Sequence, residues 1–409
     1  MPKNDYIKTI HPSEIRKIIR LLITFLGQST IENCIATYNK SLRFSGPTFR
    51  EYYLKKRHPW WEALNTFLEL ERSGKSVQKH ITDDLKRCCR DGKIITTLQK
   101  SMPEKVRKKF KKDLIDENRA RDYLFELQIA WHYYQNGFEI IWYEEEGCPE
   151  FLVKTSNFDL NVECKRVSVD ASRKIRKKDF YRLADTLLPK IEKQHLQGKI
   201  DIILNDRLHS SQQYLDSLSK QVLETLKIYQ KIQNFDIPYG SLSLDIMEQD
   251  GKPIDFIQKS HELLRQKGDE THGVILAKRE NGYPVNPLEL TIKSKKASKV
   301  LLGIKNKIKE AVTKQLDPSK PGLVICFLES IEDLNDLAND SGLQKMSSYL
   351  LNQKGFEHIA AIGFSSEERI TKEVNAELHD AQGLIFRNPN CHFNEQIKDF
   401  PFLSTQTKT

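Results

Sequence analysis

Between residues 114 and 205 the sequence alternates between helical and strand-like apolar periods, which limits the folds that the chain can adopt. A helical pattern runs to Asn136-Gly137, a pair that is typical of a helix C-cap. Strand-like runs follow at 138–146, 150–155 and 158–169. A second helical pattern over 171–195 leads into another strand-like run. The order helix, three-strand meander, helix, strand predicts an α/β fold, in which helices cover the faces of a central mixed sheet.

The rest of the chain extends this pattern in both directions. Residues 206–300 mix helices and strands and are expected to elaborate the same unit, with a separate subdomain as the alternative. Helices and apolar strands alternate again up to residue 395, so we predict one domain over 114–395. The polar residues that follow predict a disordered tail over 396–409.

Residues 1–113 read as a mostly α-helical domain with a strong basic excess. They contain 25 Lys and Arg against 12 Asp and Glu, although the whole chain has a net charge of only +9. A helix near its end combines six basic residues with an apolar stripe formed by Val106, Phe110 and Leu114. This asymmetry favours a polyanionic partner, above all nucleic acid. A solvated face that serves solubility is the alternative.

Two further features of the sequence narrow the class of protein. No apolar run approaches the ~20 residues of a membrane span, and the first residues lack the apolar core of a signal peptide, so a cytoplasmic protein is expected. The seven cysteines have no zinc-ligand spacing and predict free thiols.

One strand-like run contains Glu163-Cys164-Lys165. Residues two apart in a strand share a face, so the carboxylate and the ammonium project together. The other acid-x-Lys triplets of the chain lie in Asp-Gly turns or in a polar helical stretch. Only the triplet at 163–165 therefore combines these charges with an apolar strand.

A hairpin that turns at Ser156-Asn157 would bring a second acid to the same place. Its register pairs position i with about 313 − i, which sets Glu150 opposite Glu163. Two carboxylates at that separation need a cation between them, and their hard oxygen atoms suit Mg²⁺. Glu126 lies at the edge of the apolar stripe of the preceding helix, from which it could reach such an ion; a surface glutamate is the alternative.

These stretches together, "FELQIAWHYYQNGFEI", "PEF" and "VECKR", resemble the PD-(D/E)xK nuclease superfamily over about residues 118–205. The resemblance implies a restriction-endonuclease-like core. One position departs from the pattern, because Glu150 stands where the family usually has Asp.

The resemblance also implies roles for the residues. Glu150, Glu163 and the backbone carbonyl of Cys164 would hold Mg²⁺, for which Mn²⁺ can substitute. Lys165 would orient or help to deprotonate the attacking water, and Glu126 would support the metal or the water. The reaction would be hydrolysis of phosphodiester bonds, most plausibly in double-stranded DNA, in restriction or phage defence and with a homodimer as one arrangement.

Basic residues after the motif extend this hypothesis to substrate binding. Cations at the start of a helix oppose its dipole, and an anion contact would explain them, whereas a solvated face is the alternative. The predicted nucleic-acid-binding residues are Arg166, Arg173, Lys174, Arg176 and Lys177. Two other functions remain open, namely a protein of the same fold that binds nucleic acid without cutting it, and a protein-interaction module.

Overall fold

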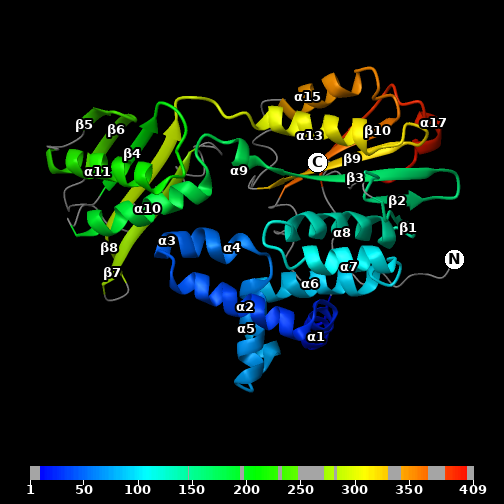
Figure 1. Ribbon diagram of the computed structural model, residues 1–409, viewed down its shortest axis with the longest axis horizontal. Helices are drawn as coiled ribbons and strands as arrows, with labels where there is room; N and C mark the ends of the chain where they lie inside the picture. Colours follow the sequence, from blue (N-terminus) through cyan, green and yellow to red (C-terminus); the bar gives the residue numbers. More distant parts are fainter. Residues whose placement is uncertain are drawn as a thin grey trace. The chain divides into compact units, whose positions relative to one another are not determined.

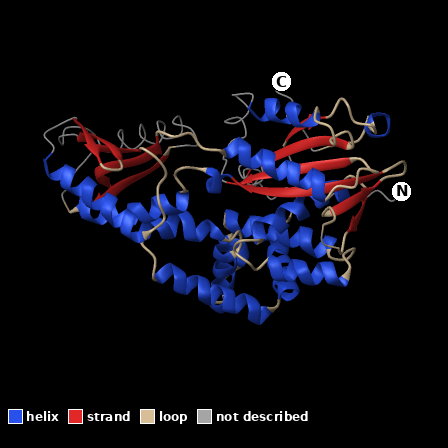
Figure 2. Ribbon diagram, turned by 45° about the horizontal axis from the view of Figure 1, so that its top comes forward, coloured by secondary structure: helices blue, strands red, loops and turns tan. Residues whose placement is uncertain are grey.

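The chain folds into two compact units, each with its own sheet (Figures 1 and 2). The computed structural model describes residues 10–145, 147–193, 198–228, 233–246, 271–280, 283–329, 342–366 and 383–402. The first unit comprises residues 1–41, 56–169 and 301–409, and the second comprises residues 42–55 and 170–300. An α/β architecture with a mixed sheet is therefore confirmed. The prediction of one domain over 114–395 is wrong, because residues 170–300 belong to a separate unit, as in the alternative of a subdomain.

The first unit is built on a six-stranded mixed sheet with the order β1-β2-β3-β9-β10-β11. Its strands are β1 (Glu139–Trp142), β2 (Phe151–Lys154), β3 (Asp159–Ser168), β9 (Gly322–Glu329), β10 (Ile359–Ser366) and β11 (Leu384–Arg387). The pairs β3–β9 and β9–β10 are parallel, and the others are antiparallel. The central strands β9 and β10 are buried almost throughout, as expected where both faces of a sheet are covered.

Helices cover both faces of this sheet, and Figure 1 shows α8 and α13 on opposite sides of β3. The helices assigned mainly to this unit are η1 (Pro12–Glu14), α1 (Ile15–Leu26), α2 (Gln28–Arg43), α4 (Lys55–Arg57), α5 (Trp61–Arg72), η3 (Val77–His80), α6 (Asp83–Leu98), α7 (Glu104–Asp113), α8 (Ala120–Gln135), α13 (Val300–Lys314), α15 (Gly342–Leu351) and α17 (Asn394–Ile397). Helix α8 ends where the sequence predicts, since Gly137 has a φ of 85°, a conformation that glycine favours.

The structure divides the chain differently from the predicted boundary at residue 113. Most of residues 1–113 belong to the same unit as the six-stranded sheet. The ring of Phe110 in α7 lies 5.0 Å from that of Tyr123 in α8 and 5.4 Å from that of Trp142 in β1. The apolar stripe of the basic helix is thus buried as predicted, but it helps to form the core of the first unit.

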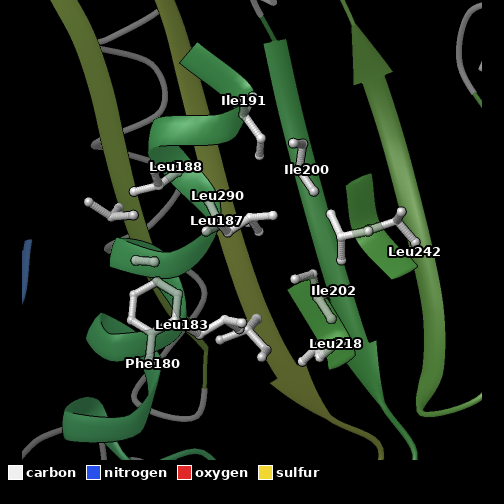
Figure 3. Packing of buried hydrophobic residues seen from close by; sticks show 14 of the residues in the cluster. Phe180, Leu183, Leu187, Leu188, Ile191, Ile200, Ile202, Leu218, Leu242 and Leu290 are labelled. Atoms are coloured by element: carbon white, nitrogen blue, oxygen red, sulfur yellow. The ribbon is translucent and has the colours of Figure 1, made fainter. Parts of the chain in front are cut away.

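The second unit has a five-stranded sheet with the order β5-β6-β4-β8-β7. Its elements are α3 (Pro47–Phe49), the π-helical η2 (Arg50–Leu54), α9 (Val169–Ser172), α10 (Lys177–Glu192), β4 (Gly198–Leu204), α11 (Gln212–Ile228), β5 (Gln233–Ile237), β6 (Gly240–Ile246), β7 (His272–Glu280) and β8 (Tyr283–Ser294). Only β4 and β8 pair in parallel. Apolar side chains of α10, among them Phe180 and Leu187, pack against Ile200, Ile202 and Leu290 of the sheet (Figure 3).

The long helix predicted over 171–195 is wrong in its first third. The described chain has a short α9, a non-helical stretch over 173–176, and then α10. The carboxylate of Asp170 accepts a hydrogen bond from the Lys177 backbone N–H, while the Lys174 backbone bonds to other loops. These contacts satisfy the backbone in a non-helical conformation that local periodicity does not reveal.

Two expectations concern the ends of the chain and membranes. Residues 396–402 of the predicted tail are ordered, because Phe400 and Phe402 are buried, and residues 403–409 lie outside the described residues. In the described part of the chain no single helix is long and apolar enough to cross a membrane; residues 12–26 and 28–43 pass that test only as a pair bent by 96°.

Candidate active site

The β2–β3 hairpin has the register that its turn predicts. Phe151 pairs with Val162 and Lys154 with Asp159, so that position i faces 313 − i. The ladder ends at Phe151, and the backbone N–H of Glu150 still donates to the Val162 carbonyl at 3.1 Å. Glu150 therefore lies beside Val162 and Glu163, just beyond the end of β2, and its backbone N–H also interacts with the Glu163 carboxyl.

Beyond this point no strand of the described residues pairs with one edge of β3. Strand β3 continues through Ser168 and pairs there with β9 on its other side only. The Val162 carbonyl points toward β2, and carbonyls two residues apart in a strand point the same way. The Cys164 carbonyl is thus directed to this open edge, on the side of Glu150.

Helix α8 brings a third acid to the same edge. Phe125 of α8 stacks on Phe327 of β9 at 5.2 Å between ring centroids, which fixes the helix against the sheet. Glu126, the next residue, is buried, and its carboxyl hydrogen-bonds that of Glu150. The alternative of a surface glutamate is therefore wrong, because Glu126 lies inside the unit beside the other acids.

The three carboxyl groups have raised pKa values. Burial, and then the Glu150 charge, raise the pKa of Glu126 well above its ordinary range. Burial and the Glu150 charge raise the pKa of Glu163 to about 8, against the effect of Lys165. Burial also raises the pKa of Glu150, although Lys109, Lys165 and the hydrogen bond from Glu126 oppose it. Like charges this close cannot all ionise, so the cluster holds protons near neutral pH.

Glu163 and Lys165 form an ion pair on the opposite face of β3 from Cys164. Burial would lower the pKa of Lys165, but the Glu163 and Glu150 charges outweigh it and raise that pKa. Both carboxylate oxygens of Glu163 are buried, and the Lys165 ammonium and the Glu150 backbone N–H stabilise their charge. A buried carboxylate needs a cation beside it, and Lys165 supplies that charge for Glu163.

The structure adds Lys109 of α7, which the sequence placed only among the lysines of a basic helix. Its ammonium lies 5.4 Å from the ring centroid of Tyr123, and its charge lowers the pKa values of Glu126 and Glu150 against the effect of burial. The available signal was its place beside the buried stripe, directly before Phe110. That signal shows that Lys109 flanks the buried face of the helix, but not that the acids Glu126 and Glu150 lie near its ammonium.

Arg166 has a different setting from the nucleic-acid contact that was predicted. Its guanidinium forms two hydrogen bonds of 3.0 Å with Glu329 and one of 2.7 Å with Asp122. It also donates to the Asn118 carbonyl. Arg166 thus joins β3, β9 and the start of α8 within the first unit.

The other predicted nucleic-acid-binding residues belong to the second unit. Arg173 is buried there, where its charge contributes to lowering the pKa of His272 after the larger effect of burial. Lys174 is half-buried, Arg176 is exposed, and Lys177 is half-buried at the start of α10. The acids with Lys165 and these four cations therefore belong to different units of the chain.

The possible metal ligands are few. Within the described residues, no group of three or more Asp, Glu, His or Cys side chains is arranged to hold one metal ion. Mg²⁺ in proteins is commonly held by one or two carboxylates and several waters. Glu150, Glu163 and the Cys164 carbonyl fit that smaller set.

No family model, curated protein or solved structure matches this chain.

Proposed function

We propose that this chain is a metal-dependent hydrolase of phosphodiester bonds. Its substrate in this proposal is DNA, and its reactive centre is the open edge of β3. The observation that carries the proposal is the meeting of three carboxyl groups with raised pKa values, Glu126, Glu150 and Glu163, beside the Lys165 ammonium. Groups with perturbed pKa values gather at functional sites because catalysis needs them. Elsewhere they only reduce stability, so they are uncommon.

Glu150, Glu163 and the Cys164 carbonyl would hold the divalent ion in this proposal. When bound, Mg²⁺ would supply the Lewis acidity that activates water and offsets the charge on a phosphate under attack. Glu126 hydrogen-bonds the Glu150 carboxyl and would help to orient it. Lys165 is held protonated by Glu163 and Glu150, so it would stabilise negative charge on the phosphate.

The test is cleavage of plasmid and linear DNA with Mg²⁺ by the full chain. Lys165→Ala and Glu163→Gln are each expected to reduce the rate by ~10²–10³-fold or more, the usual effect of removing one preorganised charge. Lys154→Ala is the matched control, because Lys154 is an exposed lysine of the same sheet. DNA and RNA left intact under varied conditions, or equal rates for the two lysine variants, would contradict the proposal.

A second function, binding of nucleic acid without cleavage, is favoured by one observation. The described residues contain no three-ligand metal group, and Lys165 is paired with Glu163. In that case the chain would bind DNA equally well with Mg²⁺ and with EDTA, and Glu163→Gln would leave binding unchanged. Cleavage by the native chain that Lys165→Ala abolishes would exclude this alternative.

A further inference from the structure

Three loops of the second unit join at one end of its parallel strand pair. Strands β4 and β8 pair in register up to Leu204 and Ser294, so both chains leave the sheet at the same place. The loops that follow them meet the segment between α9 and α10. The joining hydrogen bonds are Lys295 N–H to Leu204 O (2.9 Å), Leu208 N–H to Lys174 O (2.9 Å), Lys174 N–H to Ser298 Oγ (3.3 Å) and Lys299 N–H to Ser172 O (3.2 Å). We call residues 172–178, 205–209 and 295–299 the loop cluster.

The loop cluster is almost entirely cationic. Its charged residues are nine cations, Arg173, Lys174, Arg176, Lys177, Lys178, Arg207, Lys295, Lys296 and Lys299, and one acid, Asp206. Lys296 and Lys174 lie 2.8 and 3.4 Å from Asp206, and their hydrogen bonds lower its pKa to about 2. Six of the nine cations are exposed.

Two further acids lie at the border of the loop cluster. Asp170 accepts a hydrogen bond from the Lys177 backbone N–H, and the charge of Asp179 interacts with those of Arg176 and Lys178. Nine cations still exceed these three carboxylates, so the surface carries a net positive charge.

This distribution of charge works against folding. Lys177 and Lys178 stand in the first turn of α10, where the helix dipole disfavours cations, beside one acid, Asp179. The charges are mixed elsewhere on these helices, since Lys193 follows Glu192 at the far end of α10 and Lys220 pairs with Glu224 in the middle of α11. A ligand that carries many negative charges would relieve the repulsion in the loop cluster, and these mixed regions need none.

We propose that the loop cluster binds the phosphodiester backbone of duplex nucleic acid. Exposed lysines neutralise phosphates as point charges and do not read base edges, so the binding should depend strongly on salt and little on sequence. The cluster adds Arg207, Lys295, Lys296 and Lys299 to the cations that the sequence indicates. This inference deepens the proposed function and rests on it for the identity of the polyanion.

The test compares two triple variants of the full chain that lose the same charge. One is Lys295→Ala with Lys296→Ala and Lys299→Ala, in the loop cluster. The control is Lys190→Ala with Lys193→Ala and Lys227→Ala, at the far ends of α10 and α11. A helix of 16 residues is about 24 Å long, so the control lysines of α10 lie well away from the loop cluster. All six lysines are exposed, so both variants are expected to fold.

Binding to a duplex DNA of about 30 base pairs would be measured in EDTA, from about 50 to 200 mM salt. The loop-cluster variant is expected to bind at least ~10-fold more weakly at low salt, with a salt slope smaller by up to about 3, and the control to stay within about twofold of the native chain. Equal weakening of both variants, or unchanged binding by the loop-cluster variant, would overturn the inference.

The two proposals can fail separately, because this assay contains no metal and no cleavage. Binding through the loop cluster by a chain that never cuts DNA would contradict the proposed hydrolase only. Cleavage that depends on Lys165, together with binding that ignores the loop cluster, would contradict this inference only.

Discussion

The two units of this chain hold their charges in opposite ways. In the first, three acids lie at the open edge of β3, where burial above all raises their pKa values, and the Glu150 charge adds to this for Glu126 and Glu163. In the second, exposed cations gather on loops, and Asp206 among them has its pKa lowered to about 2. Buried acids close together keep protons or favour a metal ion. Exposed cations attract a polyanion but take no part in a reaction.

The largest effect on stability should come from Arg166 in the first unit. Arg166→Ala removes the partly buried guanidinium that donates two hydrogen bonds to the Glu329 carboxylate. The free energy of unfolding should therefore fall by about 2–3 kcal/mol. Lys296→Ala in the second unit should leave it almost unchanged, because that ion pair is exposed. Urea unfolding measures both.

DNA binding by the same Arg166 variant sharpens the comparison. Its salt slope should equal that of the native chain, since the guanidinium is bonded within the unit. A slope smaller by about 1 would mean that Arg166 contacts a phosphate, as the sequence suggested, and that the two units share the binding task.

A smaller effect is expected from Lys109. Lys109→Ala removes a charge that lowers the pKa values of Glu126 and Glu150, so both should rise. The acid limb of the pH–rate profile for cleavage should then move to higher pH, with a loss of between about two- and tenfold near pH 6.5. Lys108→Ala is the control, because Lys108 pairs with exposed Glu104 on the same helix. An identical shift of the acid limb in both variants would contradict a specific effect of Lys109 on Glu126 and Glu150.

The parts that sequence predicted well depend on local contacts. The β2–β3 register follows from a turn only a few residues away, and that turn is enough to bring Glu150 beside Glu163. The end of α8 follows from Asn136-Gly137, and the burial of Phe110 follows from a helical period.

The parts that sequence missed depend on contacts between distant residues. Arg166 and Glu329 are 163 positions apart, and nothing near Arg166 indicates this partner. The interruption before α10 depends on bonds from 172–174 to loops near 208 and 298, so periodicity alone continued the helix too far. The second sheet could not be separated from the first because strand periodicity does not reveal which strands pair.

The central claim is that the acids at the β3 edge hold protons that a divalent ion replaces. The measurement is the free energy of unfolding from pH 5 to pH 8.5, in EDTA and in saturating Mg²⁺, for the native chain and Glu163→Gln. Folding raises the pKa of Glu163 from an ordinary 4.5 to about 8, so the folded chain keeps a proton that the unfolded chain releases in this window. Stability in EDTA should therefore fall as the pH rises through it.

We expect Mg²⁺ to stabilise the native chain most at the alkaline end and to remove most of this fall in stability. In Glu163→Gln the fall in EDTA should be shallower, and Mg²⁺ should have little effect. The same pH dependence in both proteins, or a native chain whose stability does not respond to Mg²⁺, would contradict the claim.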